Sequence, residues 1–155
     1  MKSKLVLVEG LPGTGKTTAS KYIKDYLDSR GLQSELYSEG NYDNPADFEY
    51  VCYIPRVELL NIINKHPQLS SIVDKYSCID NNNVTIKYGK MWSGNRELVD
   101  DNAISELSKY DIYEGLSLED YIGLTKTKWK GFANEAENKN NITILECCFL
   151  QLIFR

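Results

Sequence analysis

Long apolar runs are missing from this sequence of 155 residues, and none reaches the roughly 18 residues of a membrane-spanning helix. No basic segment followed by an apolar one opens the chain, as it would in a secretory leader. Basic residues are also outnumbered, because the chain has 18 Lys and Arg and 22 Asp and Glu, which gives a net charge of -4. A nucleic-acid binder normally carries a basic face. We therefore expect a cytoplasmic protein with neither a membrane nor a nucleic acid as partner.

Metal-binding and disulfide patterns are missing as well. Cys52, Cys78, Cys147 and Cys148 include no CxxC spacing, and the adjacent pair would point to opposite faces of a strand. We expect buried free thiols in a reducing compartment rather than zinc ligands or disulfides. The single histidine, His66, precedes a proline, and we expect it to cap a helix end rather than to act in catalysis.

What the sequence does have is a complete phosphate-binding loop at 10–17, with the letters GLPGTGKT. The motif needs a glycine, four free positions, then Gly-Lys-Ser/Thr. Its glycines allow a tight curl in which backbone N–H groups converge on an anion. The lysine would reach the outer phosphates, the threonine hydroxyl would bind Mg²⁺, and the following helix start would add its positive dipole end. The predicted nucleotide-binding residues are Gly10, Gly13, Thr14, Gly15, Lys16, Thr17 and Thr18.

The surroundings of this loop fit the same interpretation. An apolar, β-rich run at 4–8 precedes it, and apolar residues recur at helical spacing after it until Gly31 ends the helix. Two further strands are predicted at 34–38 and 142–146. We expect an α/β fold with a parallel sheet flanked by helices, and a mostly helical insert between the second and third strands.

One domain of 155 residues is expected, with a nucleotide-binding core at 1–43, a helical acceptor and lid region at 44–140, and a third strand with the chain end at 141–155. Asn44-Pro45 predicts a helix start that carries Phe48, Val51 and Cys52 and restarts at Pro55. Further predictions are a hairpin at 76–79 and 84–88, a helix at 96–107, and a long helix from a capping box at Ser117 and Asp120 to about 137.

The segment 8–18 resembles the opening of P-loop kinases that act on small molecules, such as deoxynucleoside and thymidylate kinases. The chain also resembles a group of poorly characterised bacterial P-loop proteins in the segments 39–41, 45–47, 110–115 and 145–151. This resemblance implies a nucleotide at the carboxyl ends of the strands, with Glu39 and Glu146 facing the reaction centre. It implies that Glu146 orients Mg²⁺ or acts as the base, although Cys147 stands where such kinases usually have arginine.

The expected activity is therefore transfer of a phosphoryl group from ATP to a small molecule, with Mg²⁺ required and with Lys16, Glu39 and Glu146 in the catalytic set. Two alternatives remain open: an NTP-hydrolysing switch, and a nucleotide-binding module without catalysis. A guanine-specific site is not favoured, because the run at 138–141 lacks the Asp of Asn-Lys-x-Asp. Weaker candidates for phosphate or ring contacts are Arg56, Arg96, Tyr88, Trp92, Tyr113 and Trp129.

The end of the sequence predicts an incomplete sheet. Such kinases normally have five core strands, whereas three are found here, and the last residues, 150–155, are apolar almost throughout. We expect a C-terminally truncated chain of low or no turnover, or alternatively a homodimer formed through the exposed sheet edge.

Overall fold

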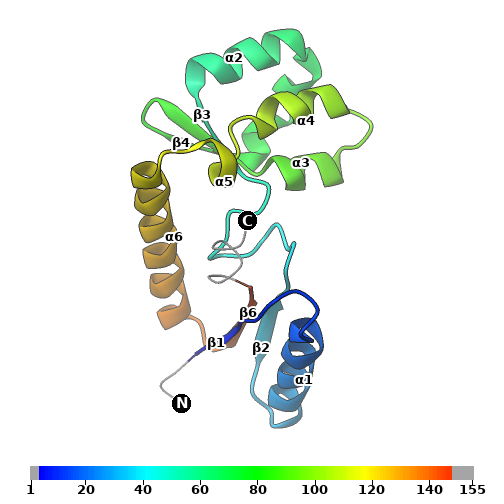
Figure 1. Cartoon of the computed structure of the whole chain (residues 1–155), viewed down its shortest axis with the longest axis vertical. Coiled ribbons are helices and arrows are strands. Elements are labelled where there is room, and N and C mark those ends of the chain that lie inside the picture. Colours follow the sequence, from blue (N-terminus) through cyan, green and yellow to red (C-terminus); the bar gives the residue numbers. More distant parts are fainter. Residues whose placement is uncertain (1–3, 148–155) are drawn as a thin grey trace. The chain divides into compact units, whose positions relative to one another are not determined.

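The computed structural model describes residues 4–147, which form two compact units (Figure 1). Of the described residues, unit 1 combines 4–47 with 124–147, and unit 2 is the continuous segment Phe48–Gly123. The second boundary falls inside one helix, α6 (Leu118–Asn138). Among the described residues, no helix is long and apolar enough to cross a membrane.

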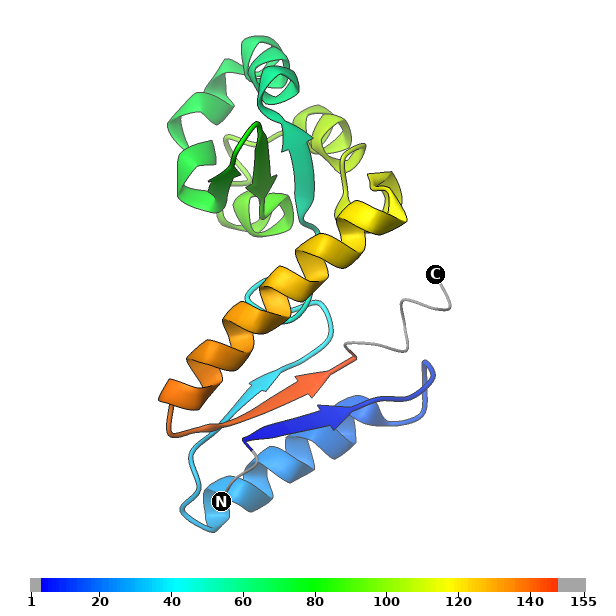
Figure 2. The same cartoon turned by 90° about the vertical axis from the view of Figure 1, so that its left-hand side faces the viewer.

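Unit 1 contains a parallel sheet of three strands, as the sequence predicted. The strands are β1 (Leu5–Val8), β2 (Ser34–Tyr37) and β6 (Ile142–Glu146), in the order β1-β6-β2. Val8 pairs with Glu146, and Tyr37 pairs with Leu145, so all three carboxyl ends meet at one edge (Figure 2). β6 is the central strand of the three, which explains why every residue in it is buried.

Two helices cover opposite faces of this sheet. Ser20 of α1 (Lys16–Ser29) lies against Glu146, whereas Phe132 of α6 packs with Leu145. Since neighbouring strand residues point to opposite faces, α1 and α6 are on different sides, as Figure 2 also shows. The predicted capping box of α6 is confirmed, because the Asp120 amide donates to Ser117 Oγ over 3.1 Å.

The edge strand β1 leaves Leu5 and Leu7 exposed by 36% and 41%. Within the described part of the sheet its outer side has no paired strand. Association through this edge stays a prediction, and the apolar end at 150–155 lies outside the described residues.

Unit 2 has its own antiparallel sheet and its own core. The strands β3 (Cys52–Pro55), β4 (Ser77–Asp80) and β5 (Asn83–Ile86) are arranged in the order β3-β5-β4. The predicted hairpin is confirmed, and its turn includes Asn81 at φ 53°. Side chains from the sheet and from surrounding helices form the core, including Ile54, Leu69, Ile86, Met91 and Leu107. The helices are α2 (Arg56–Lys65), η1 (Pro67–Ser71), η2 (Val73–Tyr76), α3 (Tyr88–Gly94), α4 (Asp101–Ser108) and α5 (Ile112–Gly115).

Several local predictions for the insert are wrong. No helix begins at Asn44-Pro45; instead the Asn44 side chain accepts from the Ala46 amide over 2.9 Å, which closes a turn. Cys52 lies in β3 rather than on a helix, so the expected helical insert contains a three-stranded sheet. The helix predicted at 96–107 begins only at Asp101, because the Asp100 carboxylate caps it by accepting from Ala103 N over 2.8 Å.

Candidate functional site

The loop between β1 and α1 has the backbone curl that its glycines were predicted to allow. Gly13 and Gly15 have φ values of 79° and 88°, in the region that side chains strongly disfavour. At Gly10 a Cβ atom would lie 2.8 Å from Thr14 Oγ1, so a side chain there would collide with the loop. The loop is closed by Thr14, whose amide and hydroxyl both donate to the Leu11 carbonyl, over 3.2 and 2.7 Å. The backbone therefore favours glycine at positions 13 and 15, and a side chain at position 10 would have to displace the Thr14 hydroxyl.

A concave site opens where the loop joins α1. It has a volume of about 400 Å³ and is lined by Gly13, Gly15, Lys16, Thr17, Thr18 and Glu39, together with Pro12. The first amides of a helix have no intrahelical acceptor, and Gly15 at the N-cap offers no side chain to bind them. No acidic residue stands in the first turn of α1. Amide donors, a helix dipole and the Lys16 ammonium therefore give this hollow the properties of an anion site.

Lys16 is the buried cation of this site. The residue is 8% exposed, and its Nζ donates to the Leu11 carbonyl over 3.1 Å. The Leu11 carbonyl belongs to the loop itself, so the ammonium group is held over the curled backbone. Its charge and a hydrogen bond from it also act on the Cys147 thiol.

Glu146 is the buried carboxyl group of this site, with no exposed surface. Thr17 Oγ1 donates to Glu146 Oε1 over 2.5 Å, and Ser20 Oγ donates to Oε2 over 3.3 Å. Among the described residues Glu146 forms no salt bridge. These two hydroxyl groups satisfy both oxygens of a carboxyl group that has no contact with solvent.

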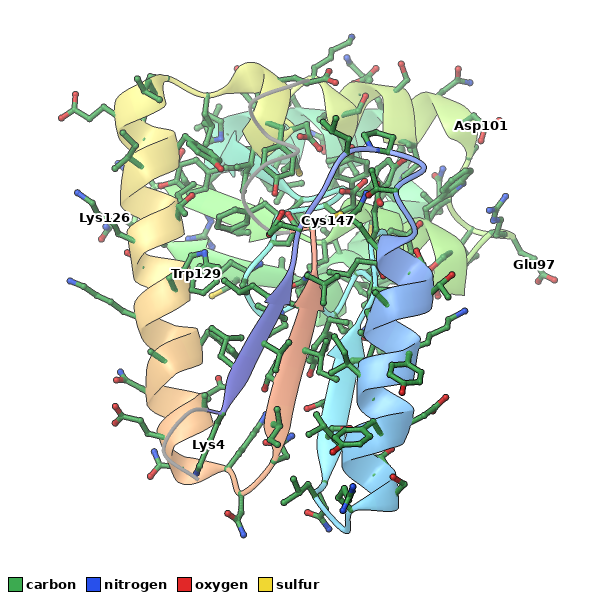
Figure 3. The ribbon with its side chains drawn as sticks, turned by 60° about the horizontal axis from the view of Figure 1, so that its bottom comes forward. Lys4, Glu97, Asp101, Lys126, Trp129 and Cys147 are labelled. Atoms are coloured by element: carbon green, nitrogen blue, oxygen red, sulfur yellow. The ribbon has the colours of Figure 1, made fainter. Side chains whose placement is uncertain are left out.

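Glu39 and Cys147 lie beside this carboxylate. One ligand atom from each of Glu39, Glu146 and Cys147 lies within 4.8 Å of the others. Glu39 is exposed, whereas Cys147 follows directly on β6 with φ at 58° (Figure 3). Burial is the main cause that raises the pKa of the Cys147 thiol to about 11, and the charge of Glu39 adds to it, while Lys16 opposes the shift. At neutral pH Cys147 is therefore a protonated, uncharged neighbour.

The structure brings together all the residues of the predicted catalytic set in unit 1, namely Lys16, Glu39 and Glu146. Ser20 and the Cys147 thiol belong to the same cluster but were not predicted. Ser20 could have been found, because it lies three residues after Thr17 and so on the same helix face. The position of the Cys147 thiol depends on the left-handed backbone at that residue, for which the sequence gives no signal.

The structure also gives the positions and contacts of His66 and of the weaker candidates for phosphate or ring contacts. His66 Nδ1 lies 3.9 Å from the Asp100 carboxylate, and His66 Nε2 lies 3.9 Å from the Glu106 carboxylate. His66 is also the residue at which α2 ends, as predicted. Arg96 stacks over the Trp92 ring at 4.0 Å, and Arg56 is an exposed first residue of α2. The three other aromatic candidates pack within their own units: Tyr88, Tyr113 and Trp129.

The free thiols differ in exposure. Cys52 and Cys147 are buried, as expected, but Cys78 is exposed on the edge strand β4, which corrects the prediction that all are buried. Cys148 and the rest of the segment to Gln151 lie outside the described residues.

Comparisons with known proteins add no assignment to this geometry. No protein-family model, no curated protein and no solved structure matches the chain.

Proposed function

We propose that unit 1 is a P-loop nucleotide-binding core, and that the chain is related to ATP- and Mg²⁺-dependent phosphotransferases acting on a small molecule. The observation that carries the proposal is the buried Glu146 carboxylate held by the Thr17 hydroxyl. A threonine at the start of a phosphate-binding helix and a carboxylate at the end of the neighbouring strand are hard oxygen donors of the kind that Mg²⁺ prefers.

Each residue has a distinct task in this proposal. The loop amides and Lys16 bind the β- and γ-phosphates and neutralise their charge. Thr17 and Glu146 hold the metal, while the exposed Glu39 faces the acceptor and orients its hydroxyl group or removes its proton. ATP supplies the phosphoryl group, and Mg²⁺ compensates the charge that develops during its transfer. Phosphoryl transfer demands mainly this positioning and charge compensation.

Nucleotide binding is tested by Lys16→Ala. Ligand at about one hundred times its dissociation constant stabilises a fold by about 2.7 kcal/mol, so Mg-ATP should raise the melting temperature of the parent protein. Lys16→Ala should lose most of this increase and keep the melting temperature of the ligand-free protein. Lys21→Ala removes an exposed lysine of the same helix and is the matched control. If Mg-ATP raised the melting temperatures of Lys16→Ala and of the control variant equally, the P-loop assignment would be refuted.

The reaction class needs a second measurement. Phosphate transfer from ATP to nucleosides, sugars and aminoglycosides is compared with release of inorganic phosphate when no acceptor is present. Transfer supports the phosphotransferase, hydrolysis alone supports an NTP-hydrolysing switch, and binding without either supports a nucleotide-binding module.

A further inference from the structure

Unit 2 contains a second hollow that the proposed function does not use. It has a volume of about 320 Å³ and lies beside the β4-β5 hairpin and the start of α3. Its lining contains three lysines, three hydroxyl residues and one thiol: Lys75, Lys87, Lys90, Tyr76, Ser77, Thr85 and Cys78. We propose that this hollow is a binding site for a small phosphorylated molecule.

Charge is the first argument for this site. The chain carries a net charge of -4, yet three of its lysines line this one hollow and no Asp or Glu does. Lys87 and Lys90 are half-buried, and each has a further interaction of its own. The property that attracts an anion is the summed positive charge at a concave surface, which raises the local concentration of anions.

The strand geometry is the second argument. Along β5, Val84 and Ile86 are buried in the core of unit 2, so Thr85 between them points to the opposite face of the sheet. Cys78 is directly opposite Thr85 in the β4-β5 pairing and therefore shares that face. The hollow is thus formed on the sheet face away from the core, beside the β4-β5 hairpin, with the Thr85 hydroxyl among its lining groups.

Size and composition favour a small ligand. A volume of about 320 Å³ is at the lower end of the range for small-molecule sites. The Tyr76 ring, with Lys75 Nζ at 5.6 Å from its centroid, and the lysine stems supply apolar walls beside the charges. A polynucleotide would need an extended basic stripe, which the overall negative charge does not favour. The phosphate group binds the lysines, and the organic part of the ligand contacts these walls.

Cys78 provides a direct reporter, because it is an exposed thiol inside the hollow. Its alkylation by iodoacetamide is followed by peptide mass spectrometry, which separates it from the other cysteines. The probes are glycerol 3-phosphate, ribose 5-phosphate and inorganic phosphate, with sodium chloride at equal ionic strength. The experiments use Lys16→Ala protein to weaken phosphate binding in the glycine-rich loop, and alkylation of Cys78 reports only on this hollow. Failure of the proposed function therefore leaves this test intact.

Saturable protection of Cys78 by a phosphate monoester is the expected result. Ligand at about nine times its dissociation constant should slow alkylation about tenfold, because nine tenths of the sites are then occupied. The triple variant Lys75→Gln, Lys87→Gln, Lys90→Gln should lose the protection. A control triple variant, Lys21→Gln, Lys126→Gln, Lys130→Gln, changes the net charge equally at exposed positions and should keep it (Figure 3 shows Lys126 pointing outward from α6).

Three results would overturn the proposal. The first is that sodium chloride slows alkylation of Cys78 as much as the phosphates do. The second is that the phosphates protect Cys78 equally in the two triple variants. The third is stronger protection by a short RNA than by any monoester, which would assign the surface to a polymer. If the first triple variant does not fold, Lys75→Glu serves instead, because Lys75 is exposed and its charge reversal should also abolish protection.

Discussion

Glu146 is a completely buried carboxyl group whose hydrogen-bond partners are two hydroxyl groups. Burial of a charge costs several kcal/mol unless an opposite charge compensates it. Thr17 and Ser20 reduce this cost but add no positive charge. The environment is explained if the carboxylate is part of a cation site that is completed by Mg²⁺ with nucleotide.

Glu146→Gln should therefore remove the effect of Mg²⁺ on nucleotide binding. The amide has the same shape but no charge. Loss of a group that only orients a metal ligand typically costs about 10- to 100-fold in metal affinity, so loss of a ligand should cost at least as much. We expect ATP binding in EDTA to equal that of the parent protein, with little further increase on addition of Mg²⁺, as measured by calorimetry.

Glu137→Gln, an exposed position of α6, is the control for the charge change. If Glu146→Gln keeps the full Mg²⁺ effect while Glu39→Gln loses it, the metal-binding role belongs to Glu39.

The sequence allowed the residues of this site to be located, but not all of their packing. The loop glycines, Lys16 and Thr17 have fixed spacing in a motif, and Glu146 follows a recognisable apolar strand, so both could be located without coordinates. The pairing of Val8 with Glu146 then placed the carboxylate beside the loop. The Cys147 thiol could not be predicted, because its position depends on a left-handed backbone at a residue that rarely adopts one.

At the level of elements, β3 shows where the sequence was insufficient. The apolar residues around Cys52 fit a helix as well as a strand, and the run is too short for its period to decide. Pairing with β5 decided the matter, since Cys52 lies opposite Ile86 and both are completely buried. The long helix and the three core strands had longer or clearer patterns, and these were confirmed.

The burial of Cys52 predicts a loss of stability at alkaline pH. Burial, with the nearby charge of Asp111 as the second cause, raises the pKa of this thiol from 9.0 to about 12. The folded state thus favours the protonated thiol, and its contribution is complete below pH 9 and is lost as the pH rises toward 12. One such group should lower the free energy of unfolding by about 1.4 kcal/mol between pH 8 and pH 10.

Urea unfolding at pH 8 and pH 10 measures this effect, with Cys52→Ala as the variant. We expect Cys52→Ala to be less stable than the parent protein at pH 8, because it leaves a small cavity, but to lose less stability on going to pH 10. Cys78→Ala, at an exposed position, should show the same pH dependence as the parent protein. Identical pH dependence in all three proteins would contradict the assignment to Cys52.

At the scale of the whole molecule, the chain has two cores built in different ways. The core of unit 2 comes from residues within the continuous segment 48–123, connected by a hairpin and short helices. The sheet of unit 1 joins β1 and β2 to β6, more than a hundred residues later in the chain. Unit 2 can therefore form from local contacts, whereas unit 1 must close a long loop before its central strand is in place.

Each unit has one tryptophan, Trp92 in unit 2 and Trp129 in unit 1, so their unfolding can be followed separately. In Trp129→Phe the remaining fluorescence reports unit 2, and in Trp92→Phe it reports unit 1. Mg-ATP should shift the urea midpoint of Trp92→Phe to higher concentration and leave that of Trp129→Phe unchanged, because the proposed nucleotide site belongs to unit 1 alone. A segment of residues 48–123 produced alone should unfold cooperatively at the midpoint of Trp129→Phe. Equal shifts of both midpoints by Mg-ATP, together with an unfolded isolated segment, would instead show that the two units form a single cooperative structure.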